Sequence, residues 1–293
     1  MYIAKLMSHK WEEEPISMTK SGYAGTFAIF FYSCNMKCIY CQNSKISHIP
    51  LSCLKENFDA NEKHLANEHT NIANDKQKKT FFEKDKKIFY TEEELSDEML
   101  IAERNNASSI SFITSVLYID AVAETIKLAK KKGLKIPIVY NSSGYETVSS
   151  LKKLSGLVDI YLPDFKYWTN ELGKMYSKVP NYVDIAKLAI EEMYRQVGNK
   201  LIVRHLVLPG HTENAKNIIK YLYDTYGDNI TLSIMSQYTP ILTNDEIKNF
   251  PNLQRKLTKR EYDKVVDYAI SIGVKNAYIQ DGDVAKESFI PDF

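Results

Sequence analysis

The stretch from Thr26 to Cys41 reads TFAIFFYSCNMKCIYC, so an apolar run leads directly into three cysteines. The run from Thr26 to Tyr32 is rich in aromatic residues and is typical of a buried strand. The cysteines that follow, Cys34, Cys38 and Cys41, have a C-x3-C-x2-C spacing. Three thiolates on one short loop can converge on a single metal centre. This stretch therefore predicts a strand that ends at a metal-binding loop.

Further apolar runs alternate with helical patterns along most of the chain. The predicted strands cover residues 109–114, 136–140, 158–162, 201–207, 230–235 and 277–279. The predicted helices cover residues 91–105, 118–132, 183–197, 212–226 and 258–272. Nearly continuous apolar strands between helices indicate a parallel sheet that is covered on its faces. The pattern favours a complete or partial β/α barrel, and periodicity alone leaves an open doubly wound sheet as the rival.

One charged segment interrupts this alternation. Between Ile49 and Ile88, 15 of 40 residues are charged and neither Gly nor Val occurs, so the segment can bury little apolar surface. We therefore expect a polar insertion after the cysteine loop. The expected organisation is a single domain over residues 1–293, with the strand and loop at 22–48, the insertion at 49–88 and the rest of the barrel at 89–280.

The overall charge and hydropathy argue against two classes of protein. Lys and Arg number 38 against 37 Asp and Glu, which gives a formal net charge of +1. This balance gives no support to nucleic-acid binding, which is usually driven by a basic surface. No apolar run reaches the roughly 18 residues of a membrane helix, and the first residues do not resemble a signal peptide. We expect a cytoplasmic protein with no nucleic-acid or membrane partner.

The cysteine loop is compatible with two kinds of metal site. A four-iron cluster has four corners, so three thiolates leave one iron open to bind substrate or cofactor. A structural zinc site needs a fourth ligand, which His48 or Cys53 could supply. The spacing is unusual for zinc, and no second C-x2-C pair is present in the chain. The cluster is therefore favoured, Cys53 is expected to lie outside the site, and a zinc-stabilised binding module without turnover is the alternative of another class.

The loop, with Tyr40 before its last cysteine and an apolar strand before its first, resembles the signature of radical S-adenosylmethionine (SAM) enzymes. The resemblance implies a partial (β/α)6 barrel and one [4Fe-4S] cluster held by Cys34, Cys38 and Cys41. It places SAM on the open iron and Tyr40 near the adenine. It also implies that flavodoxin or ferredoxin reduces the cluster, after which SAM is cleaved to a 5'-deoxyadenosyl radical that abstracts a hydrogen atom.

Several longer phrases are similar to the PflX-type branch of this superfamily, whose proteins are often named as pyruvate formate-lyase activating enzymes. The phrases are Gly25-Thr26, Cys41–Asn43, Tyr140–Glu146, Val158–Tyr167, Arg195–Gly198 and Arg204–Gly210. The resemblance implies an activating enzyme for a glycyl-radical enzyme, with a small molecule or another peptide site as the alternative substrate. One departure is the absence of a Gly-Gly-Glu stretch that holds the SAM amino group, and Thr114 and Ser115 stand at that position.

Two pairs of polar residues follow predicted strands, at the end of a barrel where active sites form. Asp164 and Lys166 resemble the Asp-x-Lys pair that activating enzymes use near SAM, which makes them the candidate catalytic residues and Lys166 a partner for the SAM carboxylate. The alternative is an exposed ion pair of little value. Asn141 and Ser142 resemble a SAM-proximal position, and a simple turn is their alternative.

Three more residues on the later strands are candidates for the site or its surroundings. Side chains alternate along a strand, so only one of Arg204 and His205 can face the interior. Arg204 is expected there because a guanidinium suits a carboxylate, whereas His205 is expected in the core. Gln237, which ends a predicted strand, is expected to wall the SAM site.

Overall fold

The structure is a computed structural model and describes residues 1–56 and 87–280. One sheet has five strands in the order β1-β2-β3-β4-β5, and a second has three in the order β6-β7-β8. The strands are β1 Ile3–His9, β2 Thr26–Phe31, β3 Ser109–Ile113, β4 Ile138–Ser142, β5 Ile160–Pro163, β6 Ile202–Leu206, β7 Thr231–Met235 and β8 Ala277–Ile279.

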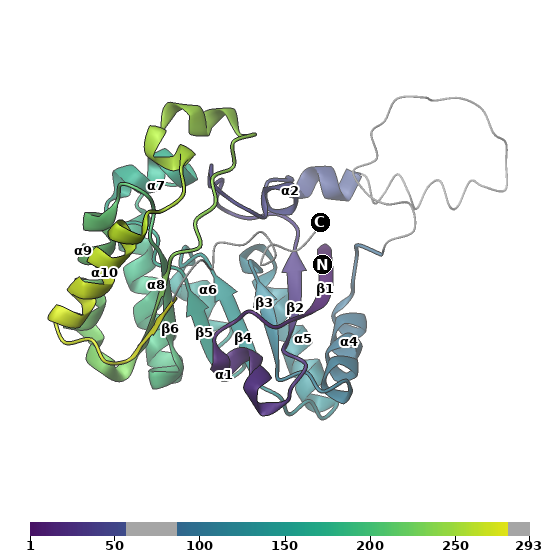
Figure 1. Cartoon of the computed structure of the whole chain (residues 1–293). Coiled ribbons are helices and arrows are strands. Elements are labelled where there is room, and N and C mark those ends of the chain that lie inside the picture. The colour runs from purple at the N-terminus through teal and green to yellow at the C-terminus, as the bar shows by residue number, and fades with distance from the viewer. Residues whose placement is uncertain (57–86, 281–293) are drawn as a thin grey trace, which may run out of the picture.

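Helices follow the strands and lie around the outside of the sheets (Figure 1). The α-helices are α1 Glu14–Ser17, α2 Ser44–Ser47, α4 Glu92–Arg104, α5 Ile119–Lys131, α6 Val148–Lys152, α7 Asn170–Ser177, α8 Tyr182–Val197, α9 Thr212–Tyr226 and α10 Lys259–Ser271. Short 3-10 turns cover Thr19–Ser21, Val116–Tyr118, Gly198–Lys200, Gly227–Asn229, Asp245–Asn249 and Pro251–Gln254.

The two sheets form a partial barrel. Within each sheet the strands from β2 to β7 pair in parallel. The sheets meet between β5 and β6 through the parallel bridges Tyr161–Leu201 and Asp164–Arg204. In the part of the chain that the structure describes, β1 and β8 end the series and do not pair with each other. The strand order follows the chain order, whereas a doubly wound sheet reverses it at a switch point. The predicted partial (β/α)6 barrel is therefore confirmed, and the rival is excluded.

Local signals explain where several helices begin. Thr91 accepts a hydrogen bond from the Glu94 amide and the Glu94 side chain bonds back to the Thr91 amide, which together form a capping box at the start of α4. Thr258 and Glu261 form the same motif at the start of α10. The buried residues of α5 belong to the same apolar cluster as Ile110 and Phe112 of β3, which are fully buried. The main core therefore lies between the strands and the helices that cover them.

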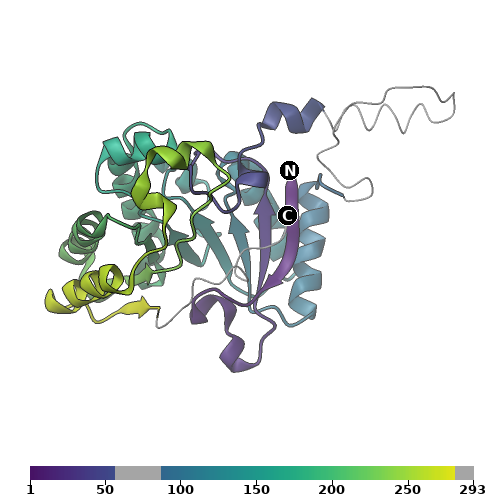
Figure 2. The same cartoon turned by 45° about the horizontal axis from the view of Figure 1, so that its top comes forward.

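The N-terminal segment forms two elements that the sequence patterns do not predict. Strand β1 pairs antiparallel with β2, from Ile3 opposite Phe31 to His9 opposite Thr26. The short α1 then lies below the strands (Figures 1 and 2), where Ile16 is fully buried against inward-facing residues such as Val139 and Ile202. This segment closes the barrel at the end opposite the cysteine loop.

The predicted insertion is described only at its two ends. Residues 51–56 are helical, and Ile88 is buried beside Tyr2 and Leu54. Residues 57–86 of the predicted 49–88 insertion lie outside the described residues. No helix within residues 1–56 and 87–280 is both long enough and apolar enough to cross a membrane.

Candidate active site at the cysteine loop

A cavity of about 290 Å³ is lined mainly by residues at the C-terminal ends of the barrel strands. The structure brings nearly all of the predicted site residues to its wall. These are Cys34, Cys38, Tyr40, Cys41, Thr114, Asn141, Ser142, Asp164, Lys166, Arg204 and Gln237. Ser115 differs from them, because it is fully buried and is not among the described residues that line the cavity. Cys53 lies on the helical segment 51–56 and is exposed.

The cysteine loop is fastened to the end of α7. The Lys37 amide donates to the Ser177 carbonyl oxygen at 3.0 Å, and the Ile39 amide donates to the Tyr176 carbonyl oxygen at 2.8 Å. These two amides flank Cys38, so the backbone on both sides of this cysteine is fixed. Helix α7 is not among the predicted helices, and sequence patterns give no sign that it supports the loop.

Each loop sulfur also has a hydrogen-bonding neighbour. The Ser177 hydroxyl donates to Cys38 Sγ at 2.9 Å, and the Met36 amide donates to Cys34 Sγ at 3.4 Å. Cys41 Sγ lies 3.2 Å from the Ser47 hydroxyl. Hydrogen bonds to the sulfurs are one of the means by which proteins adjust iron–sulfur clusters.

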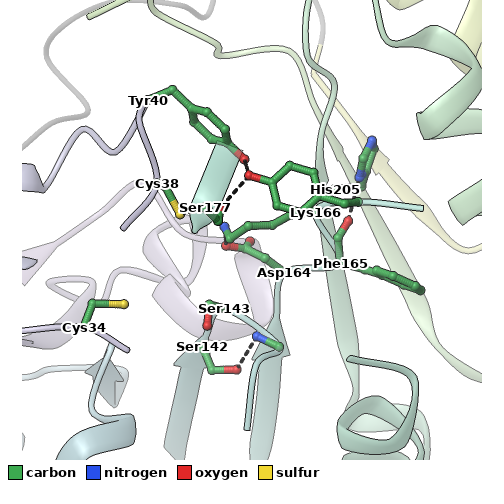
Figure 3. Close-up of polar contacts among 12 residues, drawn as sticks. Cys34, Cys38, Tyr40, Ser142, Ser143, Asp164, Phe165, Lys166, Ser177 and His205 are labelled. Carbon is green, nitrogen blue, oxygen red and sulfur yellow. Dashed lines mark hydrogen bonds and ion pairs between the residues drawn. The ribbon is translucent and has the colours of Figure 1, made fainter. Parts of the chain in front are cut away.

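The three thiols fit an iron–sulfur cluster better than a single ion. Among residues 1–56 and 87–280, no three His, Cys, Asp or Glu side chains lie close enough together to hold one metal ion. In a four-iron cluster each thiolate binds a different iron, so the sulfurs surround the cluster and do not meet at one point. Figure 3 shows Cys34 and Cys38 separated in this way, with the Asp164 and Lys166 side chains extending toward them from the other side of the view. Soft thiolates are also the ligands that such clusters use.

The Cys34 and Cys38 thiols are partly buried. Burial raises the pKa of the Cys34 thiol to about 11 and that of Cys38 to about 12, because a thiolate loses its hydration there. A coordinating metal reverses this balance, since it deprotonates a thiol outright. The positive charge of Lys166 also favours both thiolates. These cysteines are therefore suited to be metal ligands and poorly suited to be reactive free thiols.

Asp164 and Lys166 form an ion pair that faces the cavity (Figure 3). Their side chains are 27% and 19% exposed, so the predicted alternative of an exposed strand-end pair does not describe them. Burial alone would lower the pKa of Lys166, but Asp164 and then Cys38 outweigh it and hold that pKa above its ordinary value. Lys166 is therefore a fixed positive charge beside the cysteines.

The end of β4 packs directly against the end of β5. Gly144 has a φ of 73°, and a side chain there would clash with the Asp164 carbonyl oxygen. Ser142 accepts from the Gly144 amide at 3.2 Å and donates to Glu146 Oε2 at 3.2 Å. The Ser142 hydroxyl proton is thus already used, whereas Asn141 lines the cavity beside it.

Glu146 is a feature of the site that sequence reasoning missed. It is 3% exposed, and burial raises the pKa of its carboxyl to about 8. A glutamate in a turn gives no signal of burial, and only the packing of the β4 loop against β5 places it inside.

Arg204 faces the cavity, as predicted, and His205 is buried on the other side of β6. The Arg204 Nε donates to Glu13 Oε1 at 2.8 Å, and the guanidinium also pairs with Glu12. The carboxylate that we expected for Arg204 is therefore supplied by the chain itself. His205 Nδ1 lies 2.7 Å from the Phe165 carbonyl oxygen, so this nitrogen carries the proton, and burial lowers the pKa of the ring to about 4.

Tyr40 and Thr114 complete the wall. The Tyr40 hydroxyl lies 2.6 Å from the Tyr167 hydroxyl, so Tyr40 has its ring available to the cavity and its hydroxyl engaged behind it. The Tyr40 ring also meets the edge of Tyr238, next to Gln237. Thr114 has a φ of 59°, a conformation that favours glycine, and it stands at the position that corresponds by resemblance to the Gly-Gly-Glu stretch of activating enzymes.

Sequence comparison relates the chain to a known superfamily and to a curated protein. The profile of the radical SAM superfamily matches residues 28–222. The uncharacterized protein MJ0674 of Methanocaldococcus jannaschii is 31% identical over 246 residues, which are 82% of this chain and 61% of that protein. The chain therefore spans about three fifths of the length of this curated relative.

The chain is also similar to solved structures at low sequence identity. HydG, a maturase of the [FeFe]-hydrogenase, superposes with a TM-score of 0.51 and 16% identity, over 83% of this chain and 48% of that one. A domain of pyruvate-formate lyase-activating enzyme from Bacteroides vulgatus gives a TM-score of 0.41 and 14% identity, over 58% of this chain and 98% of that one. The first of these likenesses agrees with the partial barrel described above.

Proposed function

We propose, from the premise that this chain belongs to the radical SAM superfamily, that it is an activating enzyme that removes a hydrogen atom from a glycine residue of a partner protein. Members of this superfamily generally bind a [4Fe-4S] cluster and SAM. When bound, this pair supplies the electron and the carbon–sulfur bond whose cleavage gives methionine and a 5'-deoxyadenosyl radical. The observation that carries the proposal is the shared cavity of the three cysteines and the Asp164–Lys166 pair.

The residues of this cavity divide into two groups. Cys34, Cys38 and Cys41 would hold three corners of the cluster and leave the fourth iron to SAM. Lys166 is a partly buried ammonium at the same wall, so it would bind the SAM carboxylate, while Asp164 fixes its position. These charged groups would orient the cofactor and exclude water from it.

The nucleoside part of SAM would lie against neutral groups. Tyr40 presents its ring to the cavity, and Asn141 offers both a donor and an acceptor for ribose hydroxyls. Thr114 and Gln237 line the cavity as further polar contacts. We assign no such role to Arg204, because Glu12 and Glu13 already engage its guanidinium.

Two observations support a protein substrate. The phrases shared with activating enzymes include Val158–Tyr167 and Arg204–Gly210, which contribute Asp164, Lys166 and Arg204 to the cavity. Trp11 lines the cavity and is still 60% exposed, so an exposed apolar side chain, which a partner protein would cover, borders the cavity. The electron would come from a flavodoxin or ferredoxin.

The test mixes the reduced enzyme, SAM and a glycyl-radical enzyme encoded beside it, and records the electron paramagnetic resonance spectrum. A glycyl doublet that requires SAM and is missing with the Cys38→Ala variant is the expected result. Anaerobic protein should also be brown, with about four irons and four sulfides per chain. If no doublet forms and deuterium from a labelled metabolite enters 5'-deoxyadenosine, the substrate is a small molecule. Colourless protein without iron would contradict the whole proposal.

A further inference from the structure

A chain of buried hydroxyl groups ends at one of the three loop sulfurs (Figure 3). The Tyr40 and Tyr167 hydroxyls lie 2.6 Å apart, and the Tyr167 hydroxyl lies 2.6 Å from the Ser177 hydroxyl. Ser177 in turn donates to Cys38 Sγ at 2.9 Å. Tyr167 and Ser177 are fully buried, and Tyr40 is 8% exposed at the cavity wall. This series of hydrogen-bonded hydroxyl groups therefore connects the cavity wall to Cys38 through the protein interior.

The number of available protons fixes which group donates in each of these hydrogen bonds. A thiolate bound to iron can only accept a hydrogen bond, and each hydroxyl carries a single proton. Ser177 must therefore donate to Cys38, which leaves Tyr167 as the donor to Ser177. Tyr40 must then donate to Tyr167. All three protons point toward the sulfur.

Cys38 is distinguished from the other two ligands by this arrangement. Cys34 receives a backbone amide at 3.4 Å, and the Ser47 hydroxyl lies 3.2 Å from Cys41. The bond to Cys38 is the shortest of the three, and two phenols stand behind its donor. Hydrogen bonds in series polarise one another in a low dielectric, so the Ser177 hydroxyl is a stronger donor than an isolated serine.

We infer that Ser177 is a positioning residue that raises the reduction potential of the cluster through Cys38, with Tyr167 and Tyr40 polarising its hydroxyl. The inference rests on the proposed function, because it requires the cluster. In the step concerned, the cluster gains one electron from an external one-electron donor, and no covalent bond or proton changes place. A hydrogen bond to the thiolate withdraws electron density from the sulfur, which favours the cluster after it has gained this electron.

The experiment is a redox titration of the cluster-loaded enzyme with dithionite and mediators, read by the electron paramagnetic resonance signal of the reduced cluster. Ser177→Ala should lower the ratio of reduced to oxidised cluster about tenfold at a fixed potential, which is about 59 mV toward negative values for one electron. Ser177→Thr keeps the hydroxyl and should restore most of this shift. Ser47→Ala is the matched control at Cys41, and its shift should be clearly smaller.

A second variant keeps the test decisive if Ser177→Ala does not retain its iron. Tyr167→Phe removes one oxygen atom and leaves the Ser177–Cys38 bond in place, so it should shift the potential in the same direction by a smaller amount. Unchanged potentials in both variants, with full iron content, would overturn the inference and leave the proposed function standing. Wild-type protein that binds no cluster would overturn both.

Discussion

Arg204 on β6 and Glu13 at the start of α1 are 191 positions apart in the chain, yet the Arg204 Nε donates to Glu13 Oε1 at 2.8 Å. Glu12 pairs with the same guanidinium, and all three side chains are mostly buried. Because α1 follows a strand of the first sheet and β6 belongs to the second, this cluster ties the two sheets together beneath the cavity.

Replacing Arg204 by Met should destabilise the protein strongly. The change leaves two buried carboxylates without their cation, which typically costs about 3–5 kcal/mol. Urea unfolding would measure this loss. Lys220→Met is the control, because its pair with Asp224 is more than half exposed and should be worth about 1 kcal/mol or less. Equal losses in the two variants would mean that the buried cluster does not hold the sheets together.

Replacing Cys34, Cys38 or Cys41 by Ala should each remove most of the iron, because a cluster held by three thiolates cannot lose one ligand without loss of affinity. SAM cleavage should disappear with the cluster. Cys53→Ala is the matched control and should retain both, since Cys53 is exposed on the helical segment 51–56. Iron and sulfide analysis would measure the cluster content, and a 5'-deoxyadenosine assay would measure SAM cleavage. Loss of iron in the Cys53 variant would make that residue a ligand.

Lys166→Ala should weaken SAM binding while the iron content stays unchanged. A charge-assisted hydrogen bond is worth about 1.5–3 kcal/mol, so the dissociation constant should rise roughly tenfold or more. Calorimetric titration of the cluster-loaded enzyme with SAM would measure it. The control is Lys187→Ala, because Lys187 packs over Trp168 and Tyr221 and does not line the cavity in the described structure. Unchanged affinity would exclude Lys166 from SAM binding.

Glu146→Gln should stabilise the protein at neutral pH. The folded protein keeps this carboxyl protonated up to a pKa of about 8, whereas the unfolded chain releases the proton near 4.5. The folded state therefore binds more protons between these values, and its stability decreases as the pH rises through them. Gln needs no proton, so the gain should be on the order of 3 kcal/mol at pH 7 and small at pH 5.

Unfolding midpoints at the two pH values would show this difference. Glu213→Gln changes a side chain that is 78% exposed and should have little effect at either pH. An identical effect of Glu146→Gln at pH 5 and pH 7 would mean that the carboxyl is ionised in the folded protein.

The sequence predicts the barrel well because its signals are local. The Thr91–Glu94 capping box and the apolar run of β2 each depend on a few neighbouring residues, and the structure contains both. The same is true of polar residues at strand ends, such as Asn141 and Asp164. Parallel strands bring their ends to one edge, so separate local signals predict a shared cavity.

The features that the sequence did not reveal depend on distant contacts. Strand β1 has mixed polarity, and its place is set by pairing with β2. The partners of Arg204 lie in an N-terminal segment that has no barrel pattern. Ser177 reaches Cys38 across 139 positions, and no local motif marks it. Long-range pairs of this kind produce no periodic pattern in the sequence, so they can be identified only in the folded structure.

The docking of the loop on α7 has a consequence for how the enzyme matures. The amides of Lys37 and Ile39 are satisfied by helix carbonyl groups, and neither bond involves a metal. In many small metal-binding domains the free energy of metal binding drives folding, and the domain unfolds when a chelator removes the ion. In this protein the loop is held against α7 by two backbone hydrogen bonds that need no cofactor. We therefore expect that extraction of the iron leaves a folded apoprotein. Insertion of a new cluster into this apoprotein should restore the site.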